Sequence, residues 1–177
     1  LRNGLFILDG RGGLRLRMDR DSGLPDNAVL TLQASKESLW AGTSGGLYLR
    51  ENGAWRRYVD RGLGTTAIGM LHEDRAGNLW VGTAGGLIRI RDGLVAEQVD
   101  NERMGTRWDY LSAFEDREGN LWFGSAQKGV TRYDGQHFQT FTTQDGLAHN
   151  DVLDIFEDRQ GNLWFATHGG LSRYDGQ

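Results

Sequence analysis

The sequence predicts an all-β protein built from one repeated unit of about 40 residues. The segment 115–124 reads EDREGNLWFG, and it recurs as EDRQGNLWFA at 157–166, as EDRAGNLWVG at 73–82 and, with more changes, as QASKESLWAG at 33–42. Its tryptophans stand at positions 40, 80, 122 and 164. The chain also holds 27 glycines and one proline among 177 residues, which fits many turns and short strands better than long helices.

Each copy of the segment predicts a β-hairpin. Residues 109–115 and 152–157 form short apolar-rich runs before the Asp, and Leu-Trp-Phe follows the Asn. Asp accepts hydrogen bonds from nearby backbone amides and Gly adopts positive φ without strain, so Asp-Arg-x-Gly-Asn predicts a tight turn between the two strands. We therefore expect turns near 74–78, 116–120 and 158–162, and a looser turn in the first copy, where Ala34, Glu37 and Ser38 replace Asp, Gly and Asn.

The repeated residues of this hairpin are interpreted as structural, because a feature present in every copy is a poor candidate for a one-off active site. We expect each Trp to be largely buried, because a large aromatic side chain contributes mainly by burying apolar surface in the core. The structural set comprises Trp40, Trp80, Trp122, Trp164, Asp74, Asp116, Asp158, Gly77, Gly119 and Gly161.

Two further strands complete the unit. A third strand begins after Gly-Gly and ends at an Asp-Gly or Asn-Gly turn, as in 46–50, 86–91 and 170–174, and also in 4–8. A fourth strand follows at 14–18, 54–59, 94–99 and 137–142, and its alternating residues indicate one wet face and one buried face. A connector such as QDGLAHN at 144–150 then leads to the next unit, and we expect its Leu to fill the gap between units.

Four antiparallel strands per repeat, with a Trp in each, are typical of a β-propeller blade. A β-sandwich would not need one unit four times, and a leucine-rich solenoid has a shorter period. We assign a partial blade to residues 1–20, blades to about 21–60, 61–105 and 106–145, and a partial blade to 146–177, which gives seventeen strands in about four blades. These boundaries fit a piece of a larger propeller, whose open terminal blades favour self-association of the isolated chain.

Composition excludes several classes of function. The formal net charge of −4 gives no general attraction to nucleic acid or to an anionic membrane. We expect no transmembrane span, because no run of about 18 apolar residues occurs, and no signal peptide at the amino end. The absence of cysteine excludes disulfides and thiolate metal sites.

Three motifs together give the repeats a family resemblance. The sequence DREGNLWFG at 116–124, GLSRYDG at 170–176 and DGLAHN at 145–150 resembles the two-component regulator propeller repeat. The resemblance covers nearly the whole chain. It implies a periplasmic sensor region of a bacterial membrane receptor, whose output domain is a histidine kinase, a hybrid sensor-regulator or a diguanylate cyclase. It also implies a small-molecule or glycan ligand and no catalysis by this segment.

No catalytic or metal-binding pattern stands out. The four histidines, at 72, 137, 149 and 168, form no close metal-ligand pair, and no Gly-rich loop precedes a helix. We therefore expect no cofactor and no metal. Two alternatives stay open: a propeller enzyme like virginiamycin B lyase, for which His168 is the best candidate residue, and a purely structural or protein-binding propeller.

A ligand is expected at the loops that enter the inner strands and leave the second strands, because several blades converge there. Residues that depart from the repeat are the candidates. Arg107 and Lys128 suit a carboxylate or sulfate, and Trp108 suits a sugar ring. The full candidate set is Arg107, Trp108, Asp109, Gln127, Lys128, His149 and His168.

Overall fold

A computed structural model of the chain describes residues 5–8, 14–18, 28–35, 38–60, 63, 65–100 and 110–176. For residues 5–8, 14–18, 99 and 100 it describes the backbone alone. The chain divides into two compact units, residues 1–69 and residues 70–177. Each unit is described by itself below.

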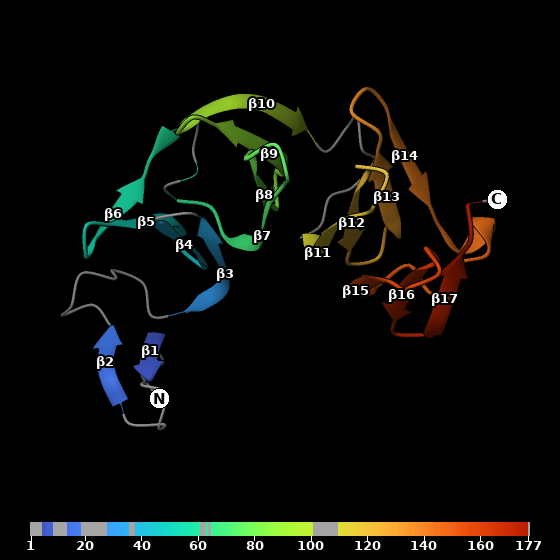
Figure 1. The fold of residues 1–177 in the computed structure, drawn as a ribbon, viewed down its shortest axis with the longest axis horizontal. Helices are drawn as coiled ribbons and strands as arrows, with labels where there is room; N and C mark the ends of the chain where they lie inside the picture. The colour runs from blue at the N-terminus through green and yellow to red at the C-terminus, as the bar shows by residue number, and fades with distance from the viewer. Residues whose placement is uncertain are drawn as a thin grey trace. The chain divides into compact units, whose positions relative to one another are not determined.

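Every extended element is a strand of an antiparallel sheet, and the described residues contain seventeen strands (Figure 1). A two-stranded sheet holds β1 (Leu5–Leu8) and β2 (Leu14–Met18). The first four-stranded sheet follows with β3 (Val29–Ser35), β4 (Ser38–Thr43), β5 (Gly46–Glu51) and β6 (Ala54–Tyr58). The all-β prediction is therefore confirmed.

Three more sheets repeat the same meander, so that each strand pairs with the next one in the sequence. The first holds β7 (Ile68–Glu73), β8 (Leu79–Thr83), β9 (Gly86–Arg91) and β10 (Leu94–Asp100). The next holds β11 (Tyr110–Glu115), β12 (Leu121–Ser125), β13 (Val130–Tyr133) and β14 (Phe138–Phe141). The last holds β15 (Val152–Glu157), β16 (Leu163–Thr167) and β17 (Gly170–Tyr174), and the short 3-10 helix η3 (Thr143–Asp145) precedes it.

The three expected hairpin turns are present, and one Asp organises each. In the β11–β12 turn, Asp116 Oδ1 accepts the backbone N–H of Asn120 at 2.8 Å, and Asp116 Oδ2 accepts both Asn120 Nδ2 and Trp122 Nε1 at 2.8 Å. The same indole bond, also at 2.8 Å, joins Trp80 to Asp74 and Trp164 to Asp158. The Asp thus fixes the turn and the Trp ring together, which explains why the two residues recur six positions apart.

The first hairpin differs from the expectation of a looser turn. Strands β3 and β4 continue until Ser35 pairs directly with Ser38, so the connection is tighter than in the other copies. Without the Asp and Asn that hold a five-residue turn open, the strands extend further toward each other. Trp40 is nevertheless buried, with its ring 5.6 Å from that of Tyr58.

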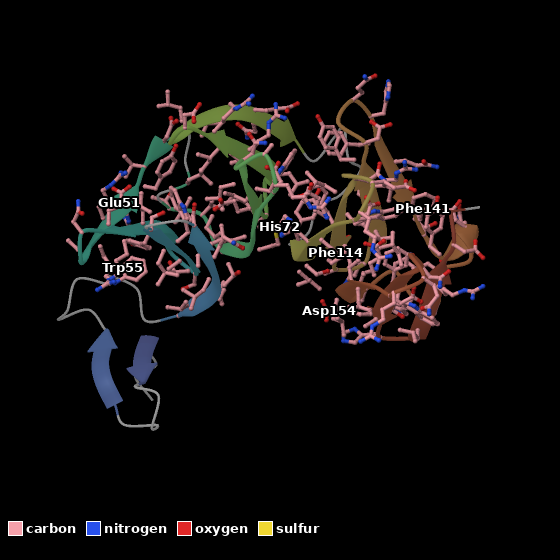
Figure 2. The ribbon with its side chains drawn as sticks, viewed as in Figure 1. Glu51, Trp55, His72, Phe114, Phe141 and Asp154 are labelled. Atoms are coloured by element: carbon pink, nitrogen blue, oxygen red, sulfur yellow. The ribbon has the colours of Figure 1, made fainter. Side chains whose placement is uncertain are left out.

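Successive sheets of the second unit pack through the Trp rings. Trp80 is 1% exposed and lies 5.3 Å from Phe123 and 5.5 Å from Tyr133 of the next sheet. Trp122 is equally buried, 5.6 Å from Phe165 and 5.3 Å from Tyr174. Phe141 on the outer strand β14, labelled in Figure 2, stacks on Trp122 at 5.9 Å. Leu147 of the connector joins this cluster, which confirms its expected place between two blades.

An Arg–Glu contact repeats beside the aromatic packing. The backbone N–H of Arg75 donates to Glu115 Oε2 at 2.7 Å, and that of Arg117 donates to Glu157 Oε2 at 3.1 Å. The guanidinium of Arg117 also donates to the carbonyl oxygens of Asp158 and Arg159 in the following turn. These bonds support the structural interpretation of the repeated Asp-Arg pairs.

Trp164 departs from the expected burial. It is only half-buried, and it lines a hollow of about 370 Å³ with Asp154, Phe156, Ala166 and Leu171. Phe156 and Leu171 are each 62% exposed. In the two preceding sheets of the second unit the corresponding face is covered by the next sheet, and within the described residues no sheet covers this one. We call this surface, on strands β15 to β17, the uncovered face.

Ala166 distinguishes the uncovered face from the covered ones. Its counterparts are Gly82 and Gly124, where an added Cβ would lie 2.7 Å from Tyr110 Cβ and 2.9 Å from Val152 Cγ1 of the next sheet. The covered faces therefore require glycine for the close approach of the next inner strand. A sheet that covers the face of β15 to β17 has to lie farther from Ala166 than the covering sheets lie from Gly82 and Gly124.

Replacement of Trp122 by Ala should lower the free energy of unfolding by about 3–5 kcal/mol, the range for truncating a large buried aromatic. Trp164→Ala is the matched control and should cost clearly less, because its ring is only partly buried and lines an open hollow. Urea unfolding followed by circular dichroism measures both. Equal losses would contradict the different packing of the two rings.

Asp158 should make stability depend on acid pH. Hydrogen bonds from Asn162 and then from Trp164 lower the pKa of Asp158 from 3.8 to about 2. The unfolded chain binds this proton more readily, so the contribution of Asp158 is full above pH 3.8 and is lost as pH falls toward 2. Thermal melts of the wild type and Asp158→Asn should differ at pH 7 and converge near pH 2; a constant difference would contradict the assignment.

We propose that a second copy covers the uncovered face when the chain is isolated, because its apolar residues continue the packing pattern of the inner sheets. Light scattering over a range of concentrations should show association, and Phe156→Ser with Leu171→Ser should reduce it. Leu94→Ser, an exposed apolar position on β10, is the control. A monomer at every concentration would refute this proposal.

Candidate functional site

The loops at one end of the last two sheets carry the residues that depart from the repeat. They are the β12–β13 turn, the connector between β14 and β15, and the β16–β17 turn. We call the side chains gathered there the loop cluster, which consists of Gln127, Lys128, His149, Asp151 and His168. All five belong to the second unit.

The β12–β13 turn is one residue longer than its counterparts. In the other sheets a Thr hydroxyl donates to the carbonyl three residues on, as Thr83 does to Gly86 at 3.0 Å. Here Ser125 donates to Gly129 at 2.9 Å, four residues on. The extra length places Gln127 at φ 68°, where a residue other than Gly is strained by about 1–3 kcal/mol. Such strain is typical of functional loops, so this turn is a candidate for the binding site.

Only glycine fits at position 129. An added Cβ would lie 2.0 Å from the carbonyl oxygen of Phe141, and the residue has φ +85°. The N–H of Gly129 donates to the carbonyl of Asn150 at 2.7 Å. The long turn is therefore held firmly against the connector that enters the last sheet.

Asp151 joins the three loops. Its Oδ1 accepts the backbone N–H of Gln127, and its Oδ2 accepts from His168 Nδ1 at 3.0 Å. The bond from His168 lowers the pKa of Asp151, and the bond from Gln127 acts in the same direction. The carboxylate is thus held in its charged form, with one oxygen toward each of the two turns.

The two histidines present different groups. The backbone N–H of Asp151 donates to His149 Nδ1 at 3.0 Å, so neutral His149 carries its proton on Nε2. His168 donates from Nδ1 to the carboxylate, so its Nε2 is an acceptor when the ring is neutral. The ring centres lie 6.2 Å apart and both side chains are exposed. The pair therefore offers one donor and one acceptor, which suits a hydroxyl group.

Lys128 lies in a separate hollow beside this pair. The hollow has a volume of about 260 Å³ and is lined by Gln127, Lys128, Thr142, Thr143, Gln144 and Asn150. Asn150 shapes it, because its Oδ1 accepts the backbone N–H of Thr143 at 2.8 Å. The same bond holds the connector turn together.

The structure brings together four of the seven candidate residues, Gln127, Lys128, His149 and His168. The other three, Arg107, Trp108 and Asp109, lie outside the described residues. Sequence reasoning missed Asp151, which is the centre of the cluster. A signal was present, since the position before the inner strand holds Ala28 and Ala67 in two repeats but Asp109 and Asp151 in the others.

Other hollows of the second unit are less specific. One of about 350 Å³ between the hairpin turns of the last two sheets is lined by repeated residues such as Asp116, Arg117 and Asn120. A similar hollow recurs one repeat earlier around Asp74 and Asn78. Recurrence indicates a by-product of blade packing, whereas the loop cluster occurs once among the described residues.

The chemistry available at the loop cluster is hydrogen bonding, the positive charge of Lys128 and the negative charge of Asp151, whose two oxygens already accept hydrogen bonds. Among the residues that the structure describes, no group of three or more His, Asp or Glu side chains is arranged to hold a metal ion. Nor does any described helix have the length and apolar character needed to cross a membrane. The arrangement can bind a ligand that carries hydroxyl and anionic groups.

Comparisons with known proteins agree with the fold. Residues 62–85 and 146–169 match the two-component regulator propeller. No curated protein sequence matches the chain. The extracellular domain of the hybrid two-component system BT4673 from B. thetaiotaomicron has a similar structure, with a TM-score of 0.79 and 24% identity over 99% of this chain and 25% of that one.

Two further solved structures share the architecture. The extracellular domain of the hybrid two-component system BT3049 from B. thetaiotaomicron gives a TM-score of 0.76 at 22% identity, over 97% of this chain and 24% of that one. A virginiamycin B lyase from Staphylococcus aureus gives 0.70 at 16% identity, over 98% of this chain and 63% of that one. At these identities the likeness shows the fold alone.

The chain spans about a quarter of the length of the two extracellular domains that it resembles. Its sheets, its turns and its two matching segments all follow one repeat. The chain is therefore a stretch of β-propeller blades, two segments of which match the two-component regulator propeller.

Proposed function

We propose that the chain is part of the ligand-sensing region of a bacterial membrane-bound signalling receptor. It binds an extracellular small molecule or glycan at the loop cluster, and a kinase or cyclase domain outside this chain produces the output. The segment itself is periplasmic, catalyses no reaction and needs no cofactor. The observation that carries the proposal is the loop cluster, whose residues differ from those at the same places in the other repeats. The repeats themselves match the two-component regulator propeller in two segments.

The loop cluster has the features of a binding site whose parts are fixed in advance. Asp151 accepts one bond from each neighbouring turn, and Gly129 ties the long turn to the connector. The donors and acceptors of the two histidines are thereby set before a ligand arrives. Preorganised groups lose less conformational entropy on binding, which favours recognition of a small polar molecule.

Similarity to solved structures supports the setting of this function. The two similar domains of hybrid two-component systems are extracellular. A receptor location outside the cytoplasm follows for this chain by analogy of family and fold. The virginiamycin B lyase has the same type of fold, and lyase activity is the competing function. Binding is favoured over catalysis because residues 62–85 and 146–169 match the two-component regulator propeller.

A thermal-shift screen of the native sensor region against neutral, carboxylated and sulfated mono- and oligosaccharides tests this function. We expect at least one compound to raise the melting temperature. His149→Ala with His168→Ala should weaken its binding at least about tenfold, or ~1.4 kcal/mol. His137→Ala is the matched control, because this exposed histidine lies in the β13–β14 turn at the other end of the strands.

The outcomes separate the site from the function. A ligand whose affinity survives both the double histidine variant and joint replacement of Arg107, Trp108 and Lys128 would remove the proposed site and leave the sensor function standing. Metal-dependent cleavage of a cyclic lactone by the intact protein would instead replace the sensor with a lyase.

A further inference from the structure

We propose that the hollow around Lys128 takes an anionic group of the ligand, a carboxylate or a sulfate, with the histidine pair beside it contacting hydroxyl groups. This inference rests on the proposed ligand-binding function and assigns the chemical class of the ligand. The chain builds the hollow once within its described residues, from the long β12–β13 turn and from the connector around η3.

The hollow exists because the third repeat departs from the others. Ser44-Gly45 and Ala84-Gly85 occupy the equivalent turns of the earlier sheets, and they bring neither a charge nor a long side chain. Here Ala126, Gln127 and Lys128 stand in their place, one residue more, and Gln127 adopts the left-handed region without being glycine. The contact between Gly129 and Asn150 then places the lysine against the connector rather than in a free loop.

The lining carries a single charge. Besides Lys128, it consists of two threonines, two glutamines and one asparagine, so every other lining side chain is neutral and capable of hydrogen bonding. Among the ion pairs of the described residues none includes Lys128. An exposed ammonium group without a carboxylate partner, in a hollow lined otherwise by hydroxyl and amide side chains, favours an oxyanion over a cation.

The two acidic residues of the connector, Asp145 and Asp151, already accept hydrogen bonds from other groups of the loops. Asp145 Oδ2 accepts the N–H of Thr142 at 2.9 Å and its hydroxyl at 3.1 Å, which closes the cap of η3. Asp151 accepts from Gln127 and His168. Neither carboxylate lines the hollow, so neither neutralises Lys128 by direct contact. Their longer-range charges are partly screened, because the Debye length is about 8 Å at physiological ionic strength.

The size of the hollow fits one substituted sugar ring better than a bare ion. About 260 Å³ exceeds the volume of a sulfate or carboxylate group alone and leaves room for the ring that carries it. The hydroxyls of such a ring would meet Thr142, Thr143 and the amides of the lining. His149, which shares the connector with Asn150, and His168 of the β16–β17 turn supply the next donor and acceptor along the ligand.

The test uses amide chemical shifts of the 177-residue chain, with inorganic sulfate and glucuronate as probes. Sodium chloride at equal ionic strength is the blank, and glucose is the neutral match for glucuronate. We expect saturable shifts at the amides of Gln127, Thr143 and Asn150 with both anions and none with glucose. Lys128→Gln should weaken both anions at least tenfold. Arg159→Gln, which removes an exposed cation at the opposite end of the strands, should leave both affinities unchanged.

Several results would overturn the inference. They are shifts that never saturate, shifts equal to those in sodium chloride, and anion affinities that Lys128→Gln leaves intact. Binding of glucose as tight as that of glucuronate would also end the anionic assignment while leaving the binding function standing. Saturable sulfate binding at Lys128, combined with a native sensor region that responds to no ligand of the screen, would keep the anion site and reject the sensor function.

Discussion

One buried contact recurs through the structure, the bond from a Trp indole to the Asp that begins its own hairpin. The carboxylate collects the turn amide, the Asn side chain and the indole N–H, as at Asp116. It satisfies the polar groups of a tight turn and sets the orientation of the ring that packs on the next sheet. Where the Asp is missing, in the first hairpin, the strands run on to a shorter connection.

This arrangement places the residues that stabilise the sheets and the residues of the candidate site at opposite ends of the strands. The Asp-Trp hairpins lie at one end of the strands, and the loops of the candidate site lie at the other. The hairpin residues at the first end are the same in successive repeats, and contacts such as Arg117 to Glu157 join one hairpin to the next. The loop end is therefore free to vary, and it departs from the repeat at Gln127, Lys128 and Asp151 without disturbing the packing of the Trp rings.

Much of the fold could be predicted because its determinants are local. The period of the tryptophans, the turn residues and the alternation of apolar positions indicated four-stranded meanders, and the part of the chain that the structure describes contains seventeen strands. Burial was predicted less well. Trp164 has nearly the same local sequence as Trp122, yet its exposure depends on whether another sheet covers it, and the hairpin motif that the two share does not contain that information.

The sequence by itself determined the repeat, the hairpins and the positions at which symmetry is broken, because each follows from residues within a few places of one another. Only the tertiary structure decided that Asp151 joins Gln127 to His168, and that Lys128 lies in a hollow without a carboxylate in its lining. Gln127 and Asp151 are 24 positions apart, and Asp151 and His168 are 17 apart. Contacts of this range arise when separate sheets pack, so they depend on the geometry of the repeat rather than on any one segment of it.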